Sequence, residues 1–409
     1  MTATEEGSET STRPVDLPST PPAYVLGGYE AGLAVIRSLG RAGVPVTCVV
    51  AADREHGCRS AHVAAVRIAP DPAEDPDGLA DVVAGLAPGV VIPTTDESLE
   101  AVAAHRDRLA ARHLVACPRR EVARVFLDKR LTADAAERAD VVAPRTAAAV
   151  SPEELEALVP QLQLPCLVKP RESYRYSRAF GVKMHRVDSA DALHEAWLRA
   201  YELGIGVVVQ ELIPGPETSG INYNTYVVDG APVVEFTSRK LRLSPRHFGF
   251  PSAVVSGRVP EVVAPGRRIV REMGIEGFAN VEFKRDARDG AYKLMEVNGR
   301  PNMSGALAVA CGVDFPLLTY RHLVEGRVDP ATFRPDWDHD VAWINDATDL
   351  RAAVARWRSG EATLREGAAP YARRRVFASL ALRDPGPFVD RVRARSRRRV
   401  QGLRRRVTG

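Results

Sequence analysis

Three oxygen-bearing side chains, followed closely by an arginine, have the spacing that a metal-phosphate site requires. Glu296 and Asn298 are two residues apart at the end of a segment, 292–297, that alternates as a short strand does. Both side chains therefore leave the same face of that strand. Carboxylate and amide oxygens suit a hard cation such as Mg²⁺, which shares its ligand sphere with phosphates. Arg300 follows, and Pro301 ends the strand.

A second strand is expected upstream, over residues 278–284, and it carries Glu282. The Asp289-Gly290 pair between the two strands is a strong hairpin signal. We therefore expect a hairpin that brings Glu282 beside Glu296. The same residues also fit a solvated hairpin whose charges lie on its outer face.

Length and composition describe an ordinary globular protein. The 409 residues allow two or three domains, and 45% of them are hydrophobic and 26% charged. The longest apolar runs are too short to cross a bilayer. Residues 1–22 lack the pattern of a secretory signal and are expected to be disordered. The five cysteines are scattered without metal-ligand spacing, so we expect reduced thiols and a cytoplasmic location.

The net charge of +4 conceals an asymmetry. Nine arginines and no acid follow Asp390, so the rest of the chain is mildly acidic. Aliphatic residues between Val389 and Val407 recur near helical spacing, which predicts a basic amphipathic helix. No aromatic residues are interleaved for base stacking, so the pattern favours an anionic surface, or no partner, over nucleic acid.

The first hundred residues indicate a doubly wound α/β domain. A strand and turn at 24–28 lead into a helical pattern that ends at Leu39, and further strands are expected at 46–50 and 90–93. Thr94, Thr95 and Asp96 follow the last strand, where they fit either a substrate contact or, more simply, the cap of a helix.

The pattern changes near Pro118. We expect Asp128-Lys129 between two helices, a strand that ends in Lys169, and a polar loop at 171–178. The elements expected around and after these are helices at 119–127, 131–139, 188–203, 265–273, 306–310 and 314–323, a helix opened by Ser151-Pro152, strands at 141–144, 166–170 and 206–212, and an antiparallel hairpin of 222–228 with 233–242.

The order of these parts resembles the ATP-grasp superfamily over roughly residues 23–325. The resemblance rests on Val168-Lys169-Pro170, on the Gln210 to Gly215 segment, and on the Glu296-Val297-Asn298 triplet with Glu282 upstream. Two further segments, Phe248–Ser252 and Asp384–Pro387, resemble the carboxylate-amine ligase branch that includes D-aspartate ligase.

The resemblance implies an α/β and α+β architecture in which an N-terminal Rossmann-like domain precedes a two-lobed ATP-grasp fold. The expected division is a disordered tail (1–22), a Rossmann-like pre-ATP-grasp domain (23–118), an ATP-grasp domain (119–330) with lobes of about 119–207 and 208–330, a C-terminal appendage (331–390) and an arginine-rich tail (391–409).

The resemblance also implies that ATP lies between the two lobes with Mg²⁺ or Mn²⁺, and that segment 171–181 closes over the phosphates. The implied roles are adenine contacts for Gln210, Glu211 and Leu212, ribose contacts for Glu217, phosphate contacts for Lys129 and Lys169, two metal ions held by Glu282, Glu296 and Asn298, and stabilisation of the transferring phosphoryl group by Arg300.

The implied activity is that of an ATP-dependent ligase that joins a small carboxylate to a small amine through an acyl phosphate, with ADP and phosphate as products. Lys240, or Arg242 on the same strand face, would bind the substrate carboxylate. A protein that binds ATP without catalysis remains an alternative. So does a binder of an anionic membrane surface or nucleic acid, acting through the tail.

Overall fold

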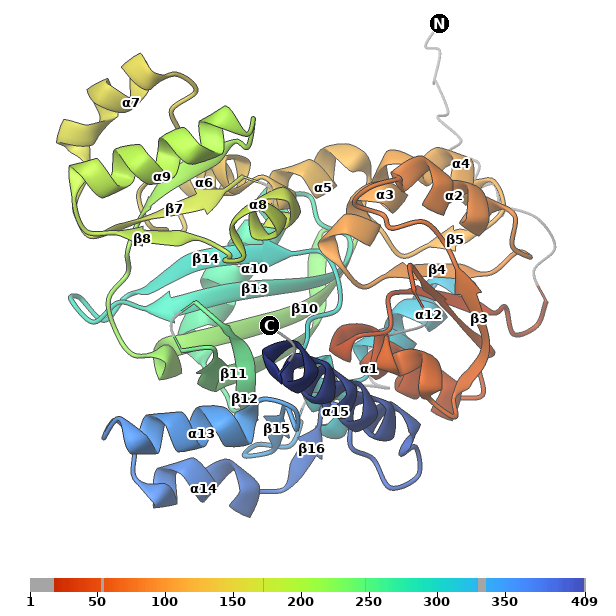
Figure 1. Cartoon of the computed structure of the whole chain (residues 1–409). Coiled ribbons are helices and arrows are strands. Elements are labelled where there is room, and N and C mark those ends of the chain that lie inside the picture. The colour runs from red at the N-terminus through yellow and green to blue at the C-terminus, as the bar shows by residue number, and fades with distance from the viewer. Residues whose placement is uncertain (1–17, 53–54, 172, 247, 330–335, 408–409) are drawn as a thin grey trace, which may run out of the picture.

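The computed structural model describes residues 18–52, 55–171, 173–246, 248–329 and 336–407. Within these residues the chain forms three sheets, with helices packed between and around them (Figure 1). None of the helices described combines the length and the apolar character that a membrane crossing needs. Residues 1–17 of the predicted disordered tail lie outside the described part.

The N-terminal domain is built on a five-stranded parallel sheet with the order β3-β2-β1-β4-β5, as the doubly wound prediction requires. Gly32 lets helix α1 approach the turn after β1, because a Cβ there would lie 1.9 Å from the Gly27 carbonyl oxygen. The elements are β1 (Ala23–Leu26), α1 (Glu30–Arg41), β2 (Val46–Val50), η1 (His56–Arg59), β3 (Val63–Ile68), α2 (Pro76–Ala84), β4 (Val90–Pro93), α3 (Asp96–Ala104), α4 (Arg106–Ala110) and β5 (Leu114–Val115).

The small lobe is a four-stranded antiparallel sheet with the order β6-β9-β7-β8. Its core contains the fully buried side chains of Tyr176 and Trp197. The elements of this part of the chain are α5 (Arg120–Leu127), α6 (Lys129–Arg138), β6 (Thr146–Ala147), α7 (Pro152–Leu158), η2 (Val159–Gln161), β7 (Cys166–Pro170), α8 (Ser173–Phe180), β8 (His185–Val187), α9 (Ala190–Glu202) and β9 (Val207–Glu211).

Three sequence predictions were wrong here. The strand expected at 141–144 is absent from this described segment, and the pairing begins only at β6, beyond Pro144, which has no N–H to donate. The loop expected at 171–178 is largely the helix α8, because Tyr176 and Phe180 are one turn apart and pack together in the core, with ring centroids 4.5 Å apart. Strand β9 belongs to this sheet, so the lobe extends to Glu211.

The large sheet has seven strands in the order β14-β13-β10-β11-β12-β15-β16, antiparallel except for the last pair. Both predicted hairpins, β10 with β11 and β13 with β14, are confirmed. The elements are η3 (Glu217–Ser219), β10 (Gly220–Val228), β11 (Ala231–Ser244), β12 (Phe250–Ser256), η4 (Pro260–Val262), α10 (Val263–Glu272), β13 (Gly277–Arg285), β14 (Tyr292–Asn298), α11 (Gly305–Ala310), α12 (Phe315–Glu325), β15 (Ala342–Ile344), α13 (Asp349–Arg358), α14 (Leu364–Ala372) and β16 (Arg375–Phe377).

Helices cover both faces of the large sheet. Side chains from α5, α6 and α10 share one core with β10, β13 and β14, so α5 and α6 support this sheet although the sequence placed them in the first lobe. Gly299, just after β14, is in close contact with α5, since a Cβ there would lie 2.5 Å from the Phe126 ring. On the other face, α11 and α12 pack against Tyr226 and Phe236.

The C-terminal part is not the separate appendage that the sequence suggested. Strands β15 and β16 continue the large sheet beyond β12, and α13 and α14 pack at that end. Each of the two strands has only three residues, which is too short for alternation to reveal.

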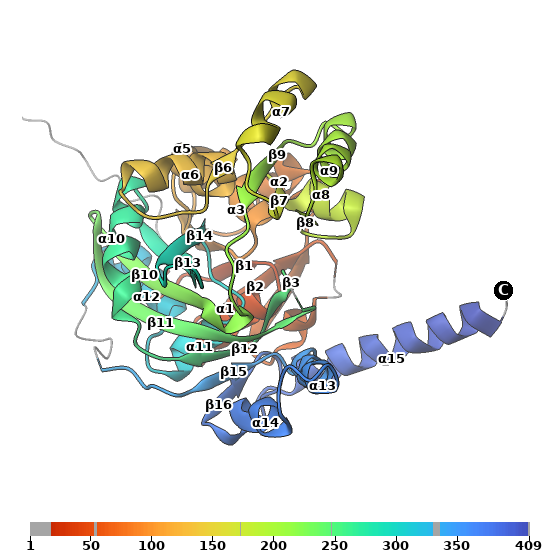
Figure 2. The ribbon, with the colours of Figure 1, turned by 90° about the vertical axis from the view of Figure 1, so that its left-hand side faces the viewer.

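The predicted basic helix is confirmed as α15 (Gly386–Val407). Its start is attached to the N-terminal domain, where the Asp384 carboxylate accepts hydrogen bonds from Arg37 Nε, Ser60 Oγ and the Ala61 N–H, each at 2.8 Å. Arg391, one turn into the helix, forms an ion pair of 2.9 Å with Glu30. The rest of α15 projects away from the body of the molecule (Figure 2).

Candidate active site

Two rows of polar side chains cross one face of the large sheet. The register pairs Asn222 with Glu282 and Glu282 with Glu296, and in the neighbouring row it pairs Asn280 with Asn298. Residues directly opposite in antiparallel strands lie on the same face. The structure therefore brings together the three side chains that the sequence proposed as metal ligands.

A chain of amide hydrogen bonds orients the second row. Asn298 Nδ2 donates to Asn280 Oδ1 at 3.3 Å, and Asn280 Nδ2 donates to Asn224 Oδ1 at 3.1 Å. Asn302, in the loop after β14, donates to the same Asn224 oxygen at 2.8 Å. These bonds occupy the amide nitrogen of Asn298 and direct its oxygen, the atom a cation binds, to the remaining side of the group.

Lys240 forms an ion pair with Glu282. Burial alone would raise the pKa of Glu282, but the positive charges of Lys240, Lys183 and Arg300 lower it below its ordinary value. The carboxylate is therefore ionised, as a metal ligand must be. Among the described residues no three His, Cys, Asp or Glu side chains cluster as a metal site. The donor set is thus two carboxylates and an amide, which fits a cation that takes its remaining oxygens from phosphates.

Arg242 does not share the site with Lys240. A register irregularity between these two residues of β11 turns Arg242 away from the polar face. Its guanidinium donates to both Asp349 oxygens, at 2.8 and 2.6 Å, in a buried pair. Its expected role as the alternative carboxylate ligand is therefore wrong, and Arg242 holds α13 against the sheet.

Lys169 enters the site from the small lobe. It is buried at the end of β7, and its ammonium donates to Gln210 Oε1 at 2.8 Å. Gln210 in turn donates to Thr146 Oγ1 at 2.9 Å. Burial lowers the pKa of Lys169 to about 8, an effect that the charge of Lys129 increases and that the carboxylates of the large sheet oppose.

Arg300 is held by the N-terminal domain. Its Nε and Nη2 atoms bind the two oxygens of Asp96 at 2.7 and 2.9 Å, a bidentate pair between the loop after β14 and the start of α3. The cap of α3 is Thr95, paired reciprocally with Ser98, so the capping interpretation holds for Thr95. Asp96 has a role that the sequence did not reveal, because its partner lies in another domain.

Lys183 is a site residue that sequence reasoning missed. It follows α8, and its ammonium lies 3.1 Å from the centre of the Phe250 ring at the start of β12. Burial lowers its pKa, while the negative charges of Glu296 and Glu282 oppose that change. The local sequence signal for this residue is the Gly181-Val182-Lys183 segment that follows the polar stretch 171–178.

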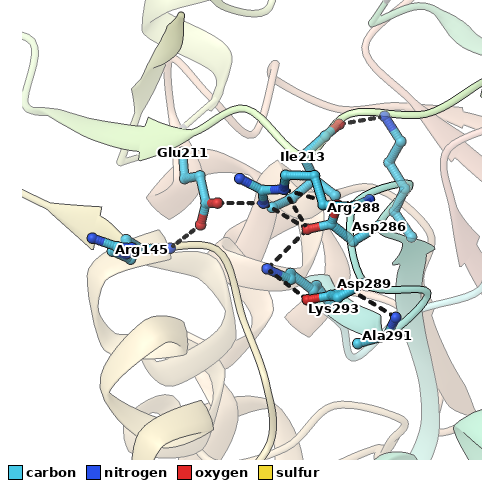
Figure 3. A network of polar contacts seen from close by, with 9 residues as sticks. Arg145, Glu211, Ile213, Asp286, Arg288, Asp289, Ala291 and Lys293 are labelled. Carbon is cyan, nitrogen blue, oxygen red and sulfur yellow. Dashed lines mark hydrogen bonds and ion pairs between the residues drawn. The ribbon is translucent and has the colours of Figure 1, made fainter. Parts of the chain in front are cut away.

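The adenine end of the expected nucleotide site contains a polar network (Figure 3). Glu211 accepts a bond from the Arg145 N–H at 3.1 Å and forms an ion pair of 2.5 Å with Arg288, which lies in the β13–β14 turn. Asp286 binds both Arg288 and Lys293. The side chain of Glu211 is therefore engaged within the protein, and the network ties the end of β9 to the hairpin that carries the acids.

The other residues expected at this end are placed as follows. Leu212 directly follows β9, and Glu217 begins η3. The side chain of Glu217 lies outside the described part of the structure. Lys129 is the first residue of α6, with Asp128 as its N-cap, and its charge acts on both Asp96 and Lys169.

Comparison with known sequences links this chain to ATP-grasp proteins and ligases. The family model described as "ATP-grasp in the biosynthetic pathway with Ter operon" matches residues 250–347. The D-alanine--D-alanine ligase of Methylococcus capsulatus is 28% identical over 191 residues, 43% of this chain and 58% of the ligase. The corresponding ligase of Pseudomonas putida is 26% identical over 209 residues, 49% of this chain and 64% of the ligase. The matched region thus covers less than two thirds of either ligase.

Solved structures show the same arrangement of sheets. The L-amino acid ligase from Bacillus licheniformis superposes with a TM-score of 0.59 at 18% identity, over 79% of this chain and 78% of that one. The biotin carboxylase from Campylobacter jejuni superposes with a TM-score of 0.61 at 15% identity, over 79% and 74% of the two chains. At these identities the likeness is one of fold.

Proposed function

We propose, on the premise that this chain belongs to the ATP-grasp superfamily, that it is an ATP-dependent ligase that joins a carboxylate to an amine. The family and the fold class are as the sequence predicted. The observation that carries the proposed activity is the cluster on the large sheet. There Glu282, Glu296 and Asn298 face cations from the small lobe, from β11 and from the loop after β14. This is the charge pattern that a nucleotide with its metal ions would need.

The proposed chemistry balances in two steps. A carboxylate oxygen of the first substrate attacks the γ-phosphorus of ATP, and ADP leaves. The nitrogen of the amine then attacks the acyl carbon, phosphate leaves, and the amine loses a proton. Mg²⁺ or Mn²⁺, when bound with ATP, would screen the phosphate charges and so permit the first attack.

We propose that residues of this chain position the nucleotide with its cations and neutralise the charge of the phosphates. Glu282, Glu296 and Asn298 would hold the cations, and Lys169 and Lys129 would neutralise the phosphates. Arg300, oriented by Asp96, would stabilise charge on the transferring group.

Two further cations are proposed for the substrate side. Lys240, held at the site by Glu282, would bind the substrate carboxylate. Lys183 would act together with Lys240, because Lys183 faces Glu282 and Glu296 from the small lobe. Adenine would lie at Gln210, Glu211 and Leu212, where backbone groups rather than the engaged Glu211 carboxylate would recognise it.

The direct test is nucleotide product analysis over a panel of carboxylates and amines. ADP and phosphate in equal amounts, with a product of the mass expected for an amide, would support the proposal. AMP and pyrophosphate would overturn it. Tight binding of ATP without turnover on any substrate pair would favour the alternative of a catalytically silent nucleotide-binding protein.

A second proposal concerns the projecting part of α15, which we propose contacts an anionic surface. Arg391 and Arg395 are engaged with the body of the protein, through Glu30 and the Ala347 carbonyl, so they are not part of that surface. The part of α15 towards the C-terminus projects from the body of the molecule (Figure 2). Beyond Ser396 the sequence has six arginines, together with Val400, Leu403 and Val407 near helical spacing.

Truncation after Ser396 tests this proposal without disturbing the docked part of the helix. The full chain should sediment with vesicles that contain phosphatidylserine, less so as salt rises, and the truncated chain should not. Equal sedimentation of the two chains would overturn the proposal. Binding to DNA but not to vesicles would overturn the membrane proposal and identify nucleic acid as the anionic partner.

A further inference from the structure

A cavity of about 310 Å³ lies between the N-terminal domain and the large sheet. Hydrophobic side chains from several helices and strands line most of its wall. They include Val35 of α1, Val115 of β5, Phe236 of β11, Phe278 of β13, Ala308 of α11 and Phe315 of α12. The proposed chemistry does not use this space.

The cavity adjoins the candidate active site on one side. Asn224 and Asn302 line it there, and Asn224 is hydrogen-bonded through Asn280 to Asn298, the proposed metal ligand. Gly299 and Pro301, the neighbours of Arg300 in sequence, also line it. A ligand in the cavity would therefore have one end at the asparagine row and the rest among hydrophobic side chains.

Three polar groups in the wall are already paired within the protein, while a fourth, Arg119, is an exposed residue. Arg106 donates through Nε to the Cys117 carbonyl at 3.1 Å, and Glu276 accepts from the backbone N–H of Asp229 and of Gly230. The Tyr226 hydroxyl lies 3.0 Å from His322 Nδ1. Apart from Arg119, the wall therefore offers mainly hydrocarbon contacts and, at the asparagine end, amides. Such a site suits an apolar group and disfavours a charged one.

We propose that this cavity binds the apolar side chain of the carboxylate substrate, whose carboxyl group reaches past the asparagine row to Lys240 beside Glu282. This inference rests on the proposed ligase function and adds the substrate class. The volume is about twice that of an engineered cavity of about 150 Å³ that binds benzene. It therefore fits an aliphatic chain or aromatic group on the order of six to ten carbon atoms, and it is larger than the side chain of alanine needs.

The test uses straight-chain carboxylic and 2-amino acids of increasing length, with MgATP and a fixed amine, and follows ADP release. The ratio kcat/KM should rise about fourfold for each added methylene, the factor that corresponds to about 0.8 kcal/mol, until the cavity is full. Ala308→Leu should fill the cavity and lower kcat/KM at least tenfold for the long acids, with little effect on the short ones. Ala310→Leu is the matched control, because Ala310 lies on the same helix and does not line the cavity.

If Ala308→Leu fails to fold, Phe278→Ala decides, since enlarging the cavity should move the optimum to longer acids. Highest activity on short polar acids, unchanged by either substitution, would overturn the inference and leave the ligase proposal intact. If no acid supports ADP release, the ligase proposal fails. Calorimetry with octanoate and MgADP then measures whether the cavity binds an apolar ligand. Octanoate binding that is lost in Ala308→Leu would then support an apolar ligand site, and no binding would overturn it.

Discussion

Replacing Lys169 with methionine should make the nucleotide-free protein more stable at neutral pH, although it should weaken ATP binding. The ammonium of Lys169 is buried at the end of β7, where it donates a hydrogen bond to Gln210 Oε1 at 2.8 Å. A buried cation without a carboxylate partner is unfavourable. Methionine has a similar length and no charge, so it removes this cost.

The expected magnitude follows from the pKa. Burial lowers the pKa of Lys169 from 10.5 to about 8, which corresponds to about 3 kcal/mol against the charged form in the folded state. The substitution leaves Gln210 Oε1 without that donor, at a cost of about 1–2 kcal/mol. The free energy of unfolding of Lys169→Met should therefore exceed that of the parent by about 1–2 kcal/mol at pH 7.

The sign of the pH dependence is fixed by the direction of the pKa change. Between pH 8 and 10.5 the unfolded chain binds more protons at Lys169 than the folded chain does, so the parent gains stability as pH rises. The cost of the buried charge is complete below about pH 8 and is lost towards pH 10.5. The advantage of Lys169→Met over the parent should therefore shrink by about 2 kcal/mol between pH 7 and 9.5.

Urea unfolding monitored by tryptophan fluorescence measures both effects, because Trp197 lies in the core of the same lobe. Lys169→Arg is the matched control, since arginine stays charged over this pH range and should show no such dependence. With MgATP present the order should reverse, because the nucleotide stabilises the parent and binds Lys169→Met weakly. If Lys169→Met were less stable than the parent at pH 7, the buried lysine would be stabilising in itself, and this reasoning would be refuted.

Three further predictions concern the other charged groups. Glu296→Gln should lower turnover by at least about a hundredfold while ATP still binds, because it removes one charge from the proposed metal site; turnover equal to the parent, measured as ADP release, would exclude the β13–β14 hairpin as that site. Asp96→Ala should lower kcat/KM by about 10- to 100-fold, and the same change in an Arg300→Ala background should have little further effect, because the bidentate pair acts as a unit; additive losses would show that Asp96 does not orient Arg300. Arg242→Met should lower the free energy of unfolding by about 3–5 kcal/mol, because it leaves the Asp349 carboxylate buried without its partner; a loss below about 1 kcal/mol in urea unfolding would refute the structural role of this pair.

The parts of the fold that the sequence predicted well are those with long alternating strands and strong turns. The Asp-Gly turns and the alternation of the adjacent strands gave both hairpins of the large sheet, and the register then placed Glu282 opposite Glu296. Local spacing was sufficient because both acids lie on neighbouring strands of one hairpin.

Contacts between distant segments were not accessible in this way. The pairs Arg300–Asp96 and Arg242–Asp349 join residues far apart in the chain, and no local pattern identifies such partners. Lys240 and Arg242 appeared equivalent from alternation alone, but the irregularity in β11 separates them. The sequence of helix α8 predicts a loop because polar and basic residues dominate it. Its buried face depends on a sheet formed by other segments.

The charge balance of the site explains why its lysines are costly and why they are retained. Five cations, Lys129, Lys169, Lys183, Lys240 and Arg300, act on three carboxylates, those of Asp96, Glu282 and Glu296. Burial lowers the pKa of Lys169 and Lys183 in the nucleotide-free protein, and neighbouring positive charges add to that change. Phosphate groups would reverse that effect, because each negative charge favours the protonated amine. The same lysines would thus reduce stability in the empty protein and contribute to affinity in the loaded one. One ligand would then attract residues of the small lobe, the large sheet and the loop beside the N-terminal domain. This attraction favours closure of the lobes around the ligand.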